Sequence, residues 1–455
     1  MSTRSNSKPF KKITMFKKLI LFTPFVTTLL FNSCSDDDFG ANAVQTINFT
    51  TYVKFDADFD HTKKPIHAKT VLKNTQTGIT YEALTNDNGE AIFPNLTPGI
   101  YSANVSFSIT PAQFEDLFGY PTDSEDNVEF SGAAQNITIN SSNVSLEIEL
   151  TSTKTIGGLI LKQIYYGGSH IKEGAMFRDQ FIEIYNNSSE VLYADGLIFG
   201  QLFGANTVEN QPYSQPNGQL DWSKGEGNKV GASANTDFVY VSHAIRIPGD
   251  GTTYAVQPGE SITIAQTAIN HKGNYYDANG KLIEILKPEL TVDLSNADFE
   301  VNMTEYLGSQ YSYDIQNPAV PDMDIVWWVS GRDLILDNLG RQAFILFRAS
   351  NEEINGFGKV KNPNNKTSYE YLQLPNEKIV DGVETTQDMG SKLVPKKLQN
   401  KQDAGYSYLT AGPYSSTSII RKTQKTINGR IILKDTNNST NDFVNIKAEP
   451  KIFAQ

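Results

Sequence analysis

Short runs of β-branched and aromatic residues, separated by turn residues, recur along this chain and restrict its fold class more than any other feature. Between residues 45 and 152 they include 68–73 and 100–106, bounded by clusters of Asn, Gly and Pro. Such bounded runs are typical of β-strands. The segment Val144–Leu150 alternates apolar and polar residues, which indicates a half-buried strand. The sequence therefore predicts a mainly β fold, with a short helix at 111–118.

Turn motifs in the first part of the chain match those of a known β-sandwich. Turns are expected at Asn74–Gly78 and Thr85–Gly89, and the sequence Phe93-Pro94-Asn95-Leu96-Thr97-Pro98-Gly99-Ile100-Tyr101 follows them. This pattern resembles the carboxypeptidase-regulatory-like domain, a transthyretin-type β-sandwich. The resemblance implies such a sandwich over 45–152, with two hairpins at these turns and no catalytic residues. Phe93, Leu96 and Tyr101 are expected to share its core.

The remainder of the chain carries a second set of strand motifs after a polar linker at 151–155. Runs of strand-forming residues include Leu159–Tyr166, Asp179–Asn187, a start at Asp195-Gly196-Leu197, Tyr254–Ile264 and Ile419–Lys422, with Asp435–Ser439 near the end. They resemble the lamin-tail domain, an immunoglobulin-like β-sandwich. The resemblance implies an enlarged domain over 157–455 with long insertions at 201–250 and 270–420. It also implies a proline-glycine hairpin at 254–264.

The N-terminal segment predicts export and lipid attachment. Residues 1–33 hold six basic and no acidic residues, and an apolar run extends from Leu19 to Phe31 before Cys34. This is the layout of a signal peptide starting at Met1 or Met15, since a run of thirteen residues is short for a membrane span. The segment 31–34 resembles a bacterial lipobox, which implies acylation of Cys34. The alternative is an ordinary signal peptide with an incidental cysteine.

An acidic stretch follows the cysteine within a predicted tether at 34–44. Ser35, Asp36, Asp37 and Asp38 resemble the acidic export signal of surface-exposed lipoproteins of Bacteroidota. The resemblance implies a protein held on the outer membrane by its lipid and exposed at the cell surface. The alternative is a solvated spacer.

Charge and cysteine content exclude several classes of protein. The chain has 39 basic and 51 acidic residues and a net charge of −12, and without residues 1–33 the balance is 33 against 51. A nucleic-acid-coating protein needs a basic face, so nucleic acid is not an expected partner. A single cysteine excludes an internal disulfide framework and zinc sites built from several cysteines.

Catalytic signatures are sparse. The motifs H-E-x-x-H, G-x-S-x-G and the Walker phosphate loop do not occur in the sequence. We therefore expect a protein that is not an enzyme, and no cofactor is predicted. A bound metal or haem stays open as an alternative.

Candidate ligand-binding residues lie in the second part of the chain. His170, His243 and His271 could converge on a metal or haem, and the alternative is three satisfied surface histidines. Trp327 and Trp328 are expected on opposite faces of a strand, one in the core and one more exposed. An exposed aromatic platform suits a sugar, a planar cofactor or a protein partner, and core filling is the alternative.

Three aspartates form a further candidate metal site. Asp56, Asp58 and Asp60 alternate, which would place them on one face of a strand as calcium ligands. The alternative is a solvated β edge that discourages edge pairing.

The whole chain resembles a Bacteroidota surface lipoprotein family of unknown function, which pairs the two sandwich types. Genes of this family commonly neighbour TonB-dependent outer-membrane receptors. The resemblance implies a non-catalytic surface protein that binds a ligand or assists TonB-dependent uptake of iron, haem or glycan. The partners it implies are the outer membrane, through the lipid anchor, and a receptor or other surface protein. An adhesin or structural surface protein and a secreted metal-dependent hydrolase are the alternatives.

Overall fold

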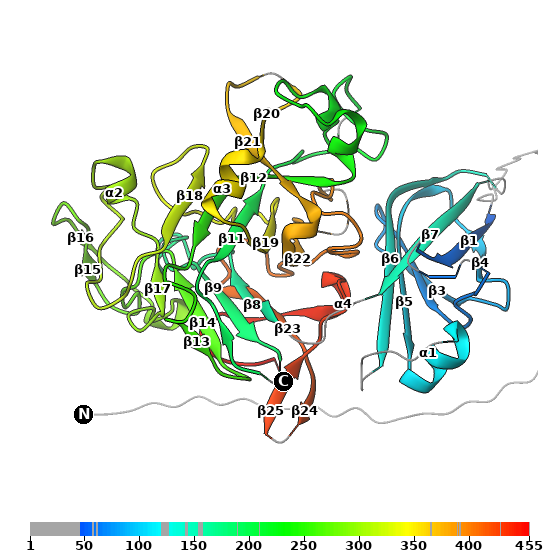
Figure 1. Cartoon of the computed structure of the whole chain (residues 1–455), viewed down its shortest axis with the longest axis horizontal. Helices are drawn as coiled ribbons and strands as arrows, with labels where there is room; N and C mark the ends of the chain where they lie inside the picture. Colours follow the sequence, from blue (N-terminus) through cyan, green and yellow to red (C-terminus); the bar gives the residue numbers. More distant parts are fainter. Residues whose placement is uncertain are drawn as a thin grey trace, which may run out of the picture. The chain divides into compact units, whose positions relative to one another are not determined.

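Strands dominate the described structure, and the protein is mainly β, as the sequence predicts (Figure 1). The computed structural model describes residues 46–56, 59–60, 62–119, 127–141, 144–152, 158–188, 190–208, 210–364, 366–388, 390, 393–427 and 429–454. All of them lie within one compact unit, residues 45–455. Within these ranges, the helices are too short or too polar to cross a membrane.

The first seven strands form one set, paired in the order β3-β2-β5-β6-β7-β1-β4. β1 runs parallel to β7, and the other pairs are antiparallel. The helix α1 (Pro111–Phe118) follows β5 at the predicted position, where Thr110 and Gln113 form a capping box. The strands are β1 (Ile47–Phe55), β2 (Lys69–Asn74), β3 (Thr80–Leu84), β4 (Glu90–Leu96), β5 (Gly99–Ile109), β6 (Val128–Ile139) and β7 (Ser145–Ser152).

Alternation along these strands builds an aromatic core. In β1 every second side chain is buried, which is the period of a strand with one face inward. Phe55 packs against Phe130 and Phe118 with ring centroids 5.0 and 5.1 Å apart. Burying each such ring stabilises the fold by roughly 1.5–3 kcal/mol. Phe93, Leu96 and Tyr101 belong to this core, which confirms the prediction for them.

One of the two predicted hairpins is present, and the prediction of the other is wrong. The turn after Asn74 joins β2 to β3, which pair with each other. The turn at Gly89 has the positive φ of +77°, and a Cβ there would come within 2.6 Å of the Val53 carbonyl oxygen. However, β4 pairs with β1 and not with β3. This turn therefore carries the chain from one half of the sandwich to the other.

The following strands build two large sheets. One has the order β17-β14-β9-β8-β23-β26 and the other β20-β21-β12-β11-β19-β22, with β18 also on β12. Among the described strands, β1–β7 pair only with one another, and β8–β26 likewise. The predicted domain limits at 152 and 157 themselves stay a prediction.

The bounds of the elements in this second set are as follows. The strands of the large sheets are β8 (Leu159–Tyr165), β9 (Phe181–Asn186), β11 (Leu197–Leu202), β12 (Phe238–Arg246), β14 (Ser261–Ala265), β17 (Phe299–Glu300), β18 (Asp324–Trp328), β19 (Ala343–Arg348), β20 (Gly358–Lys361), β21 (Glu370–Pro375), β22 (Ile379–Glu384), β23 (Thr417–Arg421) and β26 (Phe443–Lys447). Short pairs are β10 (Leu192–Tyr193) with β13 (Ala255–Val256), β15 (Tyr275–Tyr276) with β16 (Leu282–Ile283), and β24 (Thr423–Ile427) with β25 (Arg430–Leu433). The α-helices are α2 (Thr304–Leu307), α3 (Asn351–Gly356) and α4 (Ser439–Asp442), and single 3₁₀ turns occupy Trp222–Lys224, Gly231–Asn235, Pro288–Leu290 and Asn376–Lys378.

The two large sheets pack face to face. Leu161 and Ile182 from one sheet share a buried cluster with Phe199 and Phe344 from the other. A second cluster covers the opposite face of the β11–β12–β19 sheet beneath α3, where Ile354 is buried. Strands β8, β9 and β11 are therefore buried along their whole length, unlike the alternating strands of the first set. This arrangement is a β-sandwich.

The predicted proline-glycine hairpin at 254–264 is wrong, although both of its strands exist. β13 pairs with β10, whereas β14 pairs with β9 and β17. The turn at Pro258-Gly259 therefore links two different sheets. Gly259 has a φ of +85°, which explains a glycine at this sharp change of direction.

Candidate functional site

The three candidate histidines have separate surroundings. His170 is exposed, and its Nδ1 lies 3.6 Å from the Glu173 carboxylate. His271 is buried, with Nε2 3.2 Å from the Thr267 carbonyl oxygen. His243 lies on β12. Across the described residues, no three or more His, Cys, Asp or Glu side chains form a group that could hold a metal ion.

The two tryptophans lie on opposite faces of β18, as predicted. Trp328 packs against the cluster between the large sheets, and Trp327 packs against the cluster on the other face. Both are half-buried, so the expectation of one core and one exposed side chain is wrong. Trp328 contacts His243 edge-on, with ring centroids 4.3 Å apart. The structure therefore brings one predicted histidine and one predicted tryptophan together.

Asp56 and Asp60 of the aspartate triplet do not lie on a strand. β1 ends at Phe55, so Asp56 and Asp60 follow the strand, and their predicted placement on one strand face is wrong. Asp60 instead closes a turn by accepting hydrogen bonds from the backbone N–H and hydroxyl of Thr62 at 2.9 and 2.8 Å. Asp58 lies outside the described residues.

A cleft of about 600 Å³ opens beside His243. It is formed by the end of β11 and the loop after it, by β12, by the segment between β18 and β19, and by the segment that enters β21. We call it the His243 cleft. Its lining residues are Leu202, Phe203, Gly204, Asn206, Ser242, His243, Val329, Ser330, Ile335, Asp337, Arg341, Gln342, Asn362, Asn364, Lys366, Thr367, Tyr369 and Tyr371.

Stacked aromatic rings line one side of this cleft. Phe203 and Tyr371 lie nearly parallel, with centroids 4.0 Å apart and an interplanar angle of 17°. Burial raises the pKa of Tyr371 to about 12, so its hydroxyl stays neutral at physiological pH. Tyr369 is 44% exposed and precedes Tyr371 by two residues. This side of the cleft therefore combines a fixed aromatic stack with an accessible ring.

An arginine–carboxylate fork forms a polar side. Arg341 donates from Nε and Nη2 to the two carboxylate oxygens of Asp337 at 2.7 and 3.1 Å. The backbone N–H of Arg341 also donates to this carboxylate. These bonds fix the guanidinium plane, and hydrogen bonding to Asp337 raises the pKa of Arg341. Nη1 of Arg341 has no hydrogen-bond partner in the described part of the chain.

His243 supplies an acceptor. Its Nε2 lies 2.8 Å from the carbonyl oxygen of Ser330, so Nε2 carries the proton and donates it. Nδ1 is then a bare lone pair, and within the described structure it is buried without a hydrogen-bond partner. Burial lowers the pKa of His243, which keeps the ring neutral.

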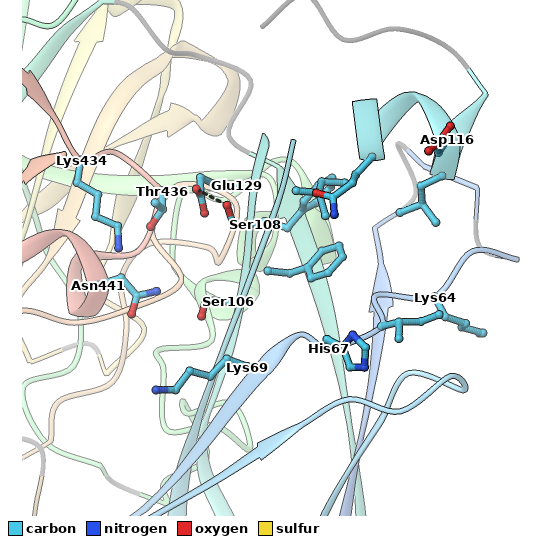
Figure 2. A pocket seen from close by; sticks show the side chains of 16 residues that line it. Lys64, His67, Lys69, Ser106, Ser108, Asp116, Glu129, Lys434, Thr436 and Asn441 are labelled. Carbon is cyan, nitrogen blue, oxygen red and sulfur yellow. Dashed lines mark hydrogen bonds between the residues drawn. The ribbon is translucent and has the colours of Figure 1, made fainter. Parts of the chain in front are cut away.

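A larger crevice of about 800 Å³ is lined mainly by the first sandwich (Figure 2). Its apolar wall includes Phe107, Leu117 and Phe130, and Ser108 donates to Glu129 at 2.7 Å. Lys69 lines it as well and pairs with Glu82 at 3.0 Å. We take the His243 cleft as the candidate site because it joins an accessible ring to a fixed fork.

Sequence reasoning missed most residues of the His243 cleft. Tyr369, Asp337 and Arg341 lie in or beside irregular segments, where periodicity gives no signal. Two weak signals were available: the alternation Tyr369-Glu370-Tyr371 and the four-residue spacing of Asp337 and Arg341. Neither spacing specifies a ligand without the fold.

The fold and the site define a β-sandwich protein with a preformed polar and aromatic cleft. Residues 257–450 match the model of DUF4876, described as a protein family of unknown function. A crystal structure of a DUF4876 family protein from Bacteroides thetaiotaomicron is similar at 26% identity and a TM-score of 0.50, covering 88% of this chain and 94% of that chain. No curated protein matches.

Two further solved structures from Bacteroides show weaker similarity. A DUF3823 family protein from Bacteroides uniformis has 9% identity, a TM-score of 0.16, and coverage of 48% of this chain and 82% of that chain. A putative cell adhesion protein from Bacteroides eggerthii has 12% identity, a TM-score of 0.16, and coverage of 48% and 78%.

Proposed function

We propose that this chain is a non-catalytic ligand-binding lipoprotein at the surface of the outer membrane, where it assists a TonB-dependent nutrient receptor. The observation that carries the proposal is the His243 cleft. Its volume of about 600 Å³ lies within the usual range of ligand pockets. Apolar and aromatic walls with a few fixed polar groups are the usual composition of such pockets.

The polar groups of the cleft are arranged for holding a ligand. The Asp337 carboxylate is bound to Arg341 and to backbone N–H groups, and the proton of His243 is directed at a carbonyl. A general base would need a lone pair directed at a reacting group and a pKa near neutrality. The remaining lone pair of His243, on Nδ1, is buried, and burial lowers the pKa of this histidine. These features support binding over proton transfer.

The surface location rests on the N-terminal sequence, which lies outside the described residues. Cys34 and the acidic run 35–38 support a lipid anchor and export to the surface. A lipid-anchored protein that presents a cleft to the medium could deliver its ligand to a neighbouring receptor.

Affinity purification and growth test the proposal together. The tagged chain is purified from outer membranes of its native host in mild detergent, and co-purifying proteins are identified by mass spectrometry. We expect a TonB-dependent receptor in near-stoichiometric amount. We also expect a deletion strain to grow slowly on at least one iron, haem or glycan source.

Complementation links that growth to the cleft. Tyr369→Ala should fail to restore growth, whereas Tyr276→Ala should restore it, because Tyr276 is exposed on β15 and does not line the cleft. A chain that purifies without a receptor, from a strain whose deletion mutant grows normally on every source, contradicts the proposal. Loss of adhesion without a growth defect would instead favour an adhesin.

A further inference from the structure

We infer that the His243 cleft binds a neutral oligosaccharide. The inference rests on the proposed binding function and specifies its ligand class. It is carried by three observations on the cleft: its charge balance, its fixed fork and its accessible aromatic ring.

The charge balance favours an uncharged ligand. The charged side chains that line the cleft are Asp337, Arg341 and Lys366. Asp337 and Arg341 neutralise each other, which leaves a single exposed lysine. The chain as a whole has a net charge of −12, so the cleft is a nearly neutral region of an acidic protein. A strongly anionic ligand would meet one unpaired cation there and a repulsive surrounding field.

The fixed fork presents hydrogen-bond donors to the cleft. Arg341 offers the N–H groups of Nη1, which have no partner in the described structure. A sugar hydroxyl has acceptor lone pairs, so it can accept from these N–H groups without carrying a charge. The bonds to Asp337 fix the guanidinium beforehand, which lowers the entropic cost of binding.

The aromatic side suits the apolar face of a sugar ring. Tyr369 is 44% exposed, and the neighbouring Tyr371 is fixed by its stack on Phe203. A tyrosine presents a flat apolar body and a polar hydroxyl at low cost in conformational entropy. The C–H face of a pyranose can cover the ring while its hydroxyls reach the fork. The cleft therefore contains both an aromatic ring for the sugar face and hydrogen-bond donors for its hydroxyls.

Isothermal titration of the purified chain with a fixed panel tests the inference. The panel contains maltohexaose, cellohexaose, xylohexaose, mannohexaose and, as the anionic probe, polygalacturonate. We expect at least one neutral hexasaccharide to bind. Tyr369→Ala should weaken that binding at least tenfold, and Arg341→Lys, which keeps the charge but loses the fork, should also weaken it.

The matched control is Tyr276→Ala, which removes a ring that is 65% exposed and lies outside the cleft. It should leave the affinity unchanged. Binding of no neutral hexasaccharide, binding of polygalacturonate alone, or a Tyr369→Ala variant with unchanged affinity would each overturn the inference. If one of these three outcomes occurs while a receptor co-purifies and growth on iron or haem depends on the chain, the proposed function stands with a different ligand.

Discussion

At the scale of single residues, burial decides the charge of His271. Its side chain is buried in the second sandwich, its Nδ1 has no partner among the described residues, and Tyr275 contacts the ring edge-on at 5.7 Å. Burial lowers its pKa to about 4, from an unperturbed value of about 6.5. The folded protein therefore holds a neutral imidazole under conditions in which the unfolded chain takes up a proton.

This difference predicts a loss of stability on acidification. Below about pH 6.5 the unfolded state binds a proton that His271 in the folded state refuses until about pH 4, so the free energy of unfolding falls across this window. The full effect is on the order of 3 kcal/mol. His271→Gln should be less stable at pH 7.5 but show a shallower decline between pH 6.5 and 4.

Urea unfolding at several pH values measures this decline. The control is His170→Gln, which replaces an exposed histidine and should follow the wild-type curve. A His271→Gln variant with the same pH dependence as the wild type would show that His271 does not contribute to it.

At the scale of elements, Arg421 joins four of them. It ends β23, and its Nε donates to the Leu161 carbonyl oxygen on β8 at 2.8 Å. Nη2 pairs with Asp381 on β22 at 2.8 Å, and Nη1 pairs with Asp442 at the end of α4 at 3.3 Å. Nη1 also contacts Asp435 at 3.1 Å. Burial raises the pKa of Asp442 to about 7 and that of Asp381 to about 6. The guanidinium of Arg421 opposes this rise because it stabilises the ionised form of both carboxylates.

Arg421→Met should therefore destabilise the protein by about 3–5 kcal/mol at pH 8, because it leaves buried carboxylates without a counter-charge. The loss should shrink at pH 5, where those carboxyl groups take up protons. Chemical denaturation at both pH values measures it. Arg332→Met replaces an exposed arginine and should change the stability little. An Arg421→Met loss that is equal at pH 5 and pH 8 would argue against the charge explanation.

The elements show how far sequence reasoning reaches. The strands were predictable, as was α1, because alternation and turn residues are local signals. The pairing partner of each strand is not a local signal, so the sequence predicts hairpins at Gly89 and Gly259 where the structure has none. A turn residue with positive φ fits a hairpin and a crossing between sheets equally well.

The same limit applies to the site. His243 and Trp328 were predicted as candidates, and antiparallel pairing of β12 with β18 places them opposite each other. Arg341 and Tyr369 meet in the cleft through irregular segments, and no local pattern marks such a meeting. Tertiary packing therefore determines the part of the site that sequence reasoning missed.

At the scale of the whole molecule, the proposed surface location requires an anchor. The described helices are too short or too polar to span one. The anchor that we propose is acylation at Cys34, the chain's single cysteine, which lies outside the described residues. Stable anchoring requires more than one acyl chain, because each buried methylene contributes only about 0.8 kcal/mol.

Cys34→Ala should move the protein from the membrane pellet to the soluble fraction, measured by fractionation and immunoblotting. The matched variant Asp36→Asn with Asp37→Asn and Asp38→Asn retains the cysteine, so it should stay in the pellet.

If the acidic run directs export, this triple variant should also lose its sensitivity to protease added to intact cells. Membrane retention of Cys34→Ala would contradict the lipid anchor, and continued protease sensitivity of the triple variant would reduce the acidic run to a spacer. The two variants thus separate attachment from surface exposure, because one removes the site of acylation and the other only the charge beside it.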